Sequence, residues 1–213
     1  MKRILLHPTY FPNIGHMIAL WNAGEITFEI HDHFEKQTYR NRMIFLGAHG
    51  RQILSVPVQH AKSLQRRPTH QVKVVNDTDW QRHHWKSLET AYRSSPYFEY
   101  YEDDLMPLFG RRFDSLVELN LATIEKIFEL LGRPLTWRLT GEYQPQAPQG
   151  VIDLRPLVRA KQKHHYIDRL EPYTQVFTDR HPFAPDLSFL DLLFMQGPAS
   201  VLYLEKHAGL LLK

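Results

Sequence analysis

A buried strand, a stiff loop and a helix are predicted, in that order, from residues 5–17, which read Leu5-Leu6-His7-Pro8-Thr9-Tyr10-Phe11-Pro12-Asn13-Ile14-Gly15-His16-Met17. The apolar run that ends at Leu6 predicts the strand, two prolines stiffen the loop, and helical spacing begins at Ile14. Loop side chains in such a unit point into the crevice beyond the strand's carboxyl end, where α/β sheets commonly bind ligands. We therefore expect a ligand site here. The alternative is a tight connection that uses Pro and Gly for geometry, with its histidines bonded to backbone.

The remaining elements follow from hydrophobic periodicity and turn signals. Strands are predicted at 25–30, 43–46, 52–58, 72–75, 135–139 and 151–157, and helices at 80–93, 97–109, 116–131 and 188–195. Asp79, Ser115 and Ser188 are the expected helix N-caps, and Ala48-His49-Gly50 is the expected hairpin turn. The sequence thus predicts an α/β or α+β fold: a central mixed sheet with an N-terminal strand–loop–helix unit, a β-hairpin and a helical middle segment.

Composition limits the class of protein. A chain of 213 residues that is 43% hydrophobic and 23% charged suits a single globular domain, 1–213, in which 141–150 is the candidate for a mobile loop. The absence of cysteine excludes disulfides, a thiol nucleophile and Cys-ligated metals. The N-terminal apolar run is too short for a signal peptide, and no stretch approaches the roughly 18 apolar residues of a membrane span. We expect a cytoplasmic protein without membrane insertion; the sequence does not indicate its oligomeric state.

A net charge of +3 is compatible with an anionic small-molecule ligand but gives little support for nucleic-acid binding. The aromatic residues at 97–101 have no basic run beside them, so base stacking is not expected. The sequence identifies no cofactor. His31 and His33 would point the same way on a strand, but no third and fourth ligand and no metalloprotease helix spacing accompany them, so no metal site is predicted.

Six segments, in order, resemble the WbqC-like family of bacterial proteins over nearly the full chain. They are Leu6-His7-Pro8-x-Tyr10-Phe11-Pro12-x-Ile14-Gly15, Arg40-Asn41-Arg42, Val56-Pro57-Val58, Trp80-x-x-x-His84-x-x-x-Leu88, Tyr92-x-x-x-Pro96-Tyr97-Phe98 and Leu187-Ser188-x-x-Asp191-Leu192-Leu193-Phe194-x-x-Gly197-Pro198. His16 is a departure, because the family commonly has an aromatic residue after Gly15. The resemblance implies a bacterial protein of poorly defined activity, from a family often encoded among genes for surface-polysaccharide assembly.

The candidate site residues come from these segments. His7 and His84 are the predicted catalytic residues: His84 shares a helix face with Trp80 at i, i+4 and could be a general base or a buried, hydrogen-bonded histidine. Strand alternation would point Arg40 and Arg42 to one side, where two guanidiniums could grip a phosphate or carboxylate; the alternative is solvated surface charge. Within Arg40-Asn41-Arg42, the family resemblance favours Asn41 and Arg42 as the residues with a role in the site. The predicted substrate-binding residues are Tyr10, Phe11, Gly15, His16, Asn41, Arg42 and Tyr92.

The opening loop also resembles the His-x-Gly-His loops of nucleotidyltransferases and class I aminoacyl-tRNA synthetases. Ile14-Gly15-His16 matches the last three residues of such a loop, Asn13 replaces the first histidine, and His7 could supply the other imidazole. The late Lys-rich or Ser/Thr-rich loop of those enzymes has no clean counterpart. A degenerate nucleotidyltransferase is therefore the further alternative.

Two functions remain in competition. The first is a cytoplasmic group transferase for surface-polysaccharide or envelope biosynthesis, acting on an activated sugar, acyl or aminoacyl donor. The second is a non-catalytic ligand-binding or assembly factor for envelope biosynthesis, which uses the same pocket or the aromatic surface at 97–101. Convergence of His7, Asn41, Arg42 and His84 around a deep pocket would favour the enzyme, and scatter with an exposed apolar patch would favour the binder.

Overall fold

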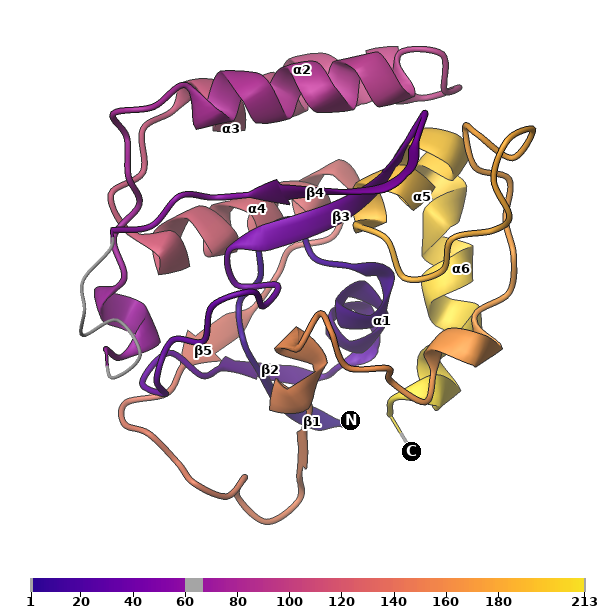
Figure 1. The fold of residues 1–213 in the computed structure, drawn as a ribbon. Helices are drawn as coiled ribbons and strands as arrows, with labels where there is room; N and C mark the ends of the chain where they lie inside the picture. The colour runs from indigo at the N-terminus through magenta and orange to yellow at the C-terminus, as the bar shows by residue number, and fades with distance from the viewer. Residues whose placement is uncertain (1, 60–66, 213) are drawn as a thin grey trace.

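The computed structural model describes residues 2–59 and 67–212. It confirms the predicted α/β or α+β class, with one four-stranded parallel sheet, a separate two-stranded hairpin and six α-helices in this part of the chain (Figure 1). The parallel and antiparallel pairings that we expected in one mixed sheet are divided between these two sheets. The strands of the parallel sheet are β1 (Arg3–Leu6), β2 (Glu25–Phe28), β5 (Trp137–Leu139) and β6 (Val151–Asp153), and those of the hairpin are β3 (Arg42–Gly47) and β4 (Gly50–Ser55).

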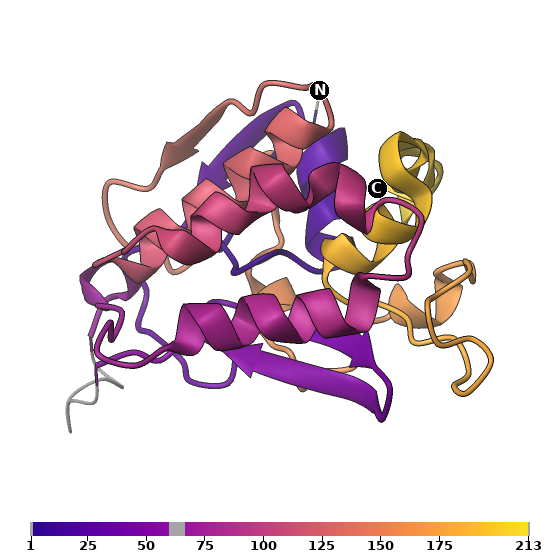
Figure 2. The ribbon, with the colours of Figure 1, turned by 90° about the horizontal axis from the view of Figure 1, so that it is seen from above.

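The helices cluster on one side of the parallel sheet. They are α1 (Ile14–Asn22), α2 (Trp80–Tyr92), α3 (Phe98–Gly110), α4 (Leu116–Leu130), α5 (Phe189–Gln196) and α6 (Ser200–Lys206). Figure 2 shows α2 running along the hairpin and α4 lying beside α3. No helix in residues 2–59 or 67–212 is long and apolar enough to cross a bilayer.

The strand order places a reversal point beside β1. The order is β5-β2-β1-β6 with every pair parallel, so the chain first builds outward from β1 through β2 to β5 and then returns to pair β6 on the other side of β1. In open parallel sheets, the crevice at the carboxyl ends of the strands where this order reverses is the usual ligand position. The ends of β1 and β6 are therefore where a site is expected.

The two faces of the sheet differ. Ile4, Leu6, Ile26 and Phe28 belong to the main hydrophobic cluster, which also contains α1 and extends through the chain to Leu211. The opposite face is covered by the connection from β5 to β6, residues 140–150, which runs below the sheet in Figure 1. Because this connection starts at the carboxyl edge of β5, its side chains can reach the crevice.

Helix α4 supports the loops at that edge. The Ser115 hydroxyl accepts a hydrogen bond from the Glu118 N–H, as the capping box predicts. One turn along, the buried Asn120 side chain donates to the Pro8 carbonyl at 3.1 Å and to the Arg40 carbonyl at 2.8 Å. This amide ties the loop after β1 to the turn before β3.

Several local predictions differ from the structure. The strand expected at 72–75 is reduced to isolated bridges, Val58 with Val74 and Lys73 with Ser115. The sequence predicts only that Leu202-Tyr203-Leu204 turns back onto the core, whereas this stretch lies within α6. Asp79 precedes α2 but its side chain makes no capping bond, whereas Ser188 caps α5 as predicted. The sequence also predicts an exposed basic loop at 62–70, with Arg66-Arg67-Pro68, and residues 62–66 of it lie outside the described part of the chain.

Candidate functional site

A cavity of about 240 Å³ lies at the carboxyl ends of β1 and β6, at the reversal point of the sheet. Its charged and titratable lining consists of His7, Asp32, Glu35, Arg40, Asp153, Arg155 and Arg159, and its less polar wall contains Tyr143 and Pro145 from the β5–β6 connection. The strand–loop–helix unit predicted from residues 5–17 therefore does border a cavity.

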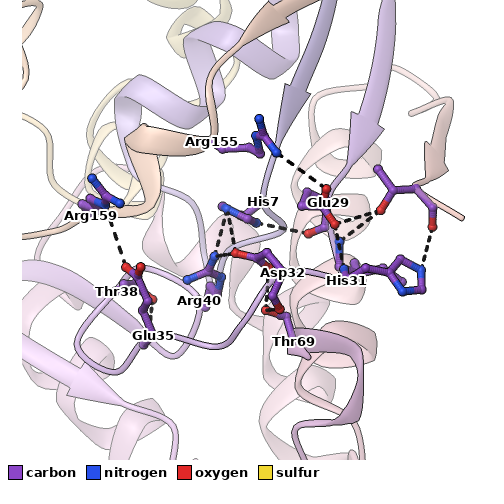
Figure 3. Close-up of polar contacts among 12 residues, drawn as sticks. His7, Glu29, His31, Asp32, Glu35, Thr38, Arg40, Thr69, Arg155 and Arg159 are labelled. Carbon is purple, nitrogen blue, oxygen red and sulfur yellow. Dashed lines mark hydrogen bonds and ion pairs between the residues drawn. The ribbon is translucent and has the colours of Figure 1, made fainter. Parts of the chain in front are cut away.

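Each parallel strand contributes the first or second residue after its end to one polar network (Figure 3). His7 follows β1, and its Nδ1–H donates to the Glu29 carbonyl, directly after β2, at 3.1 Å. Thr140 follows β5 and donates its hydroxyl to Glu29 Oε1 at 3.1 Å. Arg155 follows β6, and its Nη1 lies 3.8 Å from Glu29 Oε2. Parallel pairing brings these four positions to one edge, although they are far apart in the sequence.

His7 is held as a neutral ring. Its Nδ1 must carry the proton because the Glu29 carbonyl can only accept, so Nε2 is free to accept from Arg40 Nη2 at 2.9 Å. Burial, and then the positive charge of Arg40, lowers the pKa of His7 well below its usual 6.5. At neutral pH, His7 therefore presents a lone pair on the cavity side.

Arg40 and Asp32 form a buried ion pair beside that lone pair. Arg40 is 1% exposed, and its Nη2 also contacts Asp32 Oδ2, while Asp32 Oδ1 accepts from the Thr69 hydroxyl at 2.8 Å. Burial raises the pKa of Asp32, and Arg40 and Thr69 oppose that rise. Arg40 Nε and Nη1 are buried without a hydrogen-bond partner in the described part of the chain. Such unsatisfied donors favour a site that is completed by an anion.

His84, the second predicted catalytic residue, lies elsewhere. Its Nδ1 pairs with the Tyr10 hydroxyl at 2.9 Å, and its ring packs against Trp80 with centroids 5.0 Å apart. Neither Tyr10 nor His84 lines the cavity that contains His7. Burial first, and His83 second, lowers the pKa of His84 to about 4.

His84 is expected to make the fold acid-sensitive. In the folded protein His84 stays neutral down to about pH 4, whereas in the unfolded chain it takes up a proton near pH 6.5. Its contribution to the free energy of unfolding is therefore complete above pH 6.5 and is lost as the pH falls. Between about pH 6.5 and about pH 5 the loss attributable to this one group is about 2 kcal/mol. We expect His84→Gln, which can still pair with Tyr10, to reduce the pH dependence of urea unfolding by this amount. An equal pH dependence of unfolding in the native protein and in His84→Gln would contradict this expectation. His165→Gln, at an exposed position, is the matched control.

The N–H groups at the N-terminus of α1 already donate to other groups of the protein. The Ile14 N–H donates to the Leu187 carbonyl, the Gly15 N–H to Asp186 Oδ1 at 2.9 Å, and the His16 N–H to Asn13 Oδ1. His16 is fully buried, and burial lowers its pKa to about 3. A phosphate on this helix, as in the nucleotidyltransferase alternative, would have to displace the Asp186 carboxylate.

Gly15 and Phe11 have packing partners. A Cβ on Gly15 would lie 2.1 Å from the Tyr166 hydroxyl, which itself donates to Asp186 Oδ2 at 2.8 Å. Burial raises the pKa of Asp186 to about 7, against the hydrogen bonds it accepts. The Phe11 ring stacks on Phe109 with centroids 5.3 Å apart. Both predicted substrate-binding residues thus face the core.

Asn41, Arg42 and Tyr92 also lie outside the cavity. Asn41 donates its amide to the Val56 carbonyl, and the Tyr92 hydroxyl donates to Asp191 Oδ1 at 2.8 Å. The predicted alternation of Arg40 and Arg42 is wrong, because Arg40 lies in a turn and the strand begins at Arg42. Of the nine predicted site residues, only His7 lines the cavity.

The predicted strands were too long, and they therefore hid Arg155, which lines the cavity, and Glu29, whose carbonyl accepts from His7 beside it. Strand 25–30 was expected to include Glu29, and strand 151–157 to include Arg155, whereas the strands end at Phe28 and Asp153. Polar residues just beyond a buried parallel strand are the signal that could have found them. His31, considered for metal binding, contacts the Thr140 carbonyl at 3.0 Å. The described residues contain no group of three or more His, Asp or Glu side chains suited to a metal ion.

The comparisons with known proteins agree with the resemblance seen in the sequence. The family model described as the WbqC-like protein family matches residues 7–169. The chain belongs to this family. The matched range of this WbqC-like chain contains His7, Asp32, Arg40, Arg155 and Arg159; it ends before residues 187–198, whose likeness to the family stays a prediction.

One curated relative is similar over nearly the whole WbqC-like chain. It is the uncharacterized protein Rv1507c of Mycobacterium tuberculosis (strain ATCC 25618 / H37Rv), 23% identical over 234 residues that cover 96% of this chain and 98% of the relative. No solved structure matches the chain significantly.

Proposed function

We propose that this WbqC-like protein is a group transferase that binds the anionic part of an activated sugar, acyl or aminoacyl donor in the cavity at the carboxyl ends of β1 and β6. The observation that carries the proposal is the contact of His7 Nε2 with Arg40 at the reversal point of the parallel sheet. Arg40 also has buried N–H groups that make no hydrogen bond within the described residues. A cytoplasmic location and a role in surface-polysaccharide or envelope biosynthesis are part of the proposal, and the second rests on the family resemblance.

The proposed chemistry assigns one task to each side chain. Arg40 binds the anionic group of the donor, and this anion competes with His7 for the guanidinium. His7 Nε2 is then available to take the proton of the acceptor as the acceptor atom bonds to the transferred group and the bond to the leaving group breaks. The leaving group departs as an anion and remains paired with Arg40. Asp32, 3.4 Å from His7 Nε2, stabilises the resulting imidazolium.

His84 has a positioning role in this proposal. It fixes Tyr10 through the hydroxyl, and the Tyr10 N–H donates to the Tyr39 carbonyl at 3.0 Å, directly before Arg40. Tyr143, which is 52% exposed on the cavity wall, offers a ring face for the sugar or another flat part of the donor.

The test is a thermal-shift screen of nucleotide sugars, acyl-carrier mimics and aminoacyl compounds, followed by turnover of whichever donor binds. A donor at about a hundred times its Kd should stabilise the fold by about 2.7 kcal/mol. We expect His7→Gln to retain donor binding and to lose turnover by a factor on the order of 10² or more. Unchanged turnover would remove His7 from the chemistry, and the exposed His165→Gln serves as the control.

The second candidate, a non-catalytic binding factor, is favoured by a different observation. Both ring nitrogens of His7 are engaged, and His84, Asn41 and Arg42 do not converge on the cavity. The large exposed apolar side chains of the described residues, however, are dispersed, and only Tyr100 and Met106 share a helix, α3; the others are Ile53, Leu139, Tyr143 and Leu202. If a donor binds and is never consumed with any acceptor class, the binding factor is the correct function.

A further inference from the structure

The three arginines of the cavity differ in how many of their N–H groups are already used. Arg155 uses four of its five N–H groups: its Nε and Nη2 donate to Asp153, and its Nη1 and Nη2 donate to the carbonyls of Gln144 and Pro145. It therefore fastens the β5–β6 connection to the cavity rim. Arg40 has an unpartnered Nε and Nη1, as described above.

Arg159 is the second arginine with N–H groups to offer. Its Nε lies 3.8 Å from Glu35 Oε2, and its Nη atoms make no hydrogen bond or ion pair with the described residues. The side chain is 57% exposed, and Glu35 is 53% exposed. A ligand could therefore displace this weak pair at small cost, because exposed ion pairs contribute little.

The backbone places these two arginines beside each other. The Tyr39 N–H donates to the Val158 carbonyl at 2.9 Å, so the next residue on each segment, Arg40 and Arg159, comes to the same wall. Glu35 is held on this side by a turn in which the Thr38 hydroxyl donates to the Glu35 carbonyl at 2.9 Å. Figure 3 shows Arg159 and Glu35 facing each other next to Arg40. The Glu35 carboxylate is the only anion on the described wall that pairs with a half-exposed arginine.

We propose that Arg40 and Arg159 form a subsite for a phosphoryl group of the ligand, and that the Glu35 carboxylate occupies this subsite when the protein is empty. The inference rests on the proposed function and makes its donor a phosphate-bearing compound. Two guanidiniums on neighbouring segments repel one another: burial lowers the pKa of Arg40, and the positive charge of Arg159 adds a smaller lowering. A phosphoryl group offers three oxygens to donors on two sides, whereas a carboxylate offers two.

Glu35→Gln and Arg159→Gln test the subsite, since both side chains are exposed enough to be replaced without unfolding the chain. Inorganic phosphate and pyrophosphate are titrated into each protein at low salt and followed by NMR. We expect Glu35→Gln to bind phosphate about two- to fivefold more tightly, and Arg159→Gln to bind about tenfold more weakly. The pair Arg111 and Glu118, 2.6 Å apart and similarly exposed, gives the matched controls Arg111→Gln and Glu118→Gln, which should change nothing.

The outcomes separate this inference from the proposed function. Weaker or unchanged phosphate binding by Glu35→Gln, or phosphate binding that is indifferent to Arg159→Gln, would overturn the subsite. Acetate that binds as tightly as phosphate, with the same response to both variants, would show a carboxylate site and overturn the phosphoryl assignment. Phosphate binding that follows the expected pattern, with no donor consumed, would leave the subsite standing and refute the transferase. Donor turnover that depends on His7 but not on Arg159 would support the transferase and refute the phosphoryl subsite.

Discussion

Gly15→Ala is expected to destabilise the fold by about 3 kcal/mol, the upper part of the usual range for overpacking a core. The added Cβ would lie 2.1 Å from the hydroxyl oxygen of Tyr166 and 2.4 Å from its Cζ, closer than any real contact. The ring cannot move aside freely, because Tyr166 is fully buried and donates to Asp186, which in turn accepts from the Gly15 N–H. Urea unfolding at a fixed pH measures the loss.

The control and the rescue are both available in this chain. Gly141→Ala adds a methyl group where nothing lies within 4 Å and should change the unfolding free energy by no more than about 0.5 kcal/mol. Combining Gly15→Ala with Tyr166→Ala removes the clash, so the double variant should be more stable than the sum of the two single losses predicts. If Gly15 instead serves close approach of a phosphate, as in a nucleotide-binding loop, Gly15→Ala would keep its stability and lose only ligand binding.

The opening segment illustrates what the sequence predicted well. The apolar run, the two prolines and the helical spacing from Ile14 predicted β1, the loop and α1, and the structure confirms each. These signals are local: they depend on residues a few positions apart, and so they can be interpreted without knowing the fold. The hairpin and the capped helix α4 were predicted for the same reason.

Most residues of the segments that carried the family resemblance lie away from the cavity, and only His7 and Arg40 of them line it. Tyr10 contacts His84, Tyr92 contacts Asp191, and Gly197 accommodates the Tyr97 ring, which a Cβ would approach to 2.6 Å. A buried tyrosine hydroxyl needs a specific partner, so such pairs are restricted in sequence whether or not they take part in chemistry. Motif residues alone therefore did not distinguish packing from binding.

The cavity depended on information that no local pattern contains. His7 was predicted because it directly follows the first strand. Asp32 lies beside His7 because β2 pairs with β1 in parallel. Arg155 and Arg159 come to the same place because β6 returns to the far side of β1, which depends on the strand order. Arg40 was considered, but was treated as part of a strand that in fact begins two residues later.

Arg40→Met is expected to abolish anion binding and to raise the pKa of His7. In the native protein, Arg40 is a cause of the low His7 pKa and balances Asp32. Without the guanidinium, the Asp32 carboxylate is left 3.4 Å from His7 Nε2 with no opposite charge, and protonated His7 becomes its partner. NMR titration of the His7 ring measures the shift directly. We expect a higher His7 pKa in the variant than in the native protein, where burial, and then Arg40, lowers it well below 6.5.

The stability of this variant should depend on pH in a defined direction. Breaking a buried ion pair by removing one partner costs about 3 kcal/mol or more, and above the new His7 pKa the variant bears this cost in full. As the pH falls through that pKa, His7 takes up a proton and pairs with Asp32, so part of the loss is recovered; a group whose folded pKa is raised contributes stability at low pH. Arg138→Met, at a 67% exposed arginine paired with Glu25, should cost less than about 1 kcal/mol at every pH. An unchanged His7 pKa in Arg40→Met would mean that His7 and Arg40 are not coupled, and the transferase chemistry proposed for this cavity would lose its base.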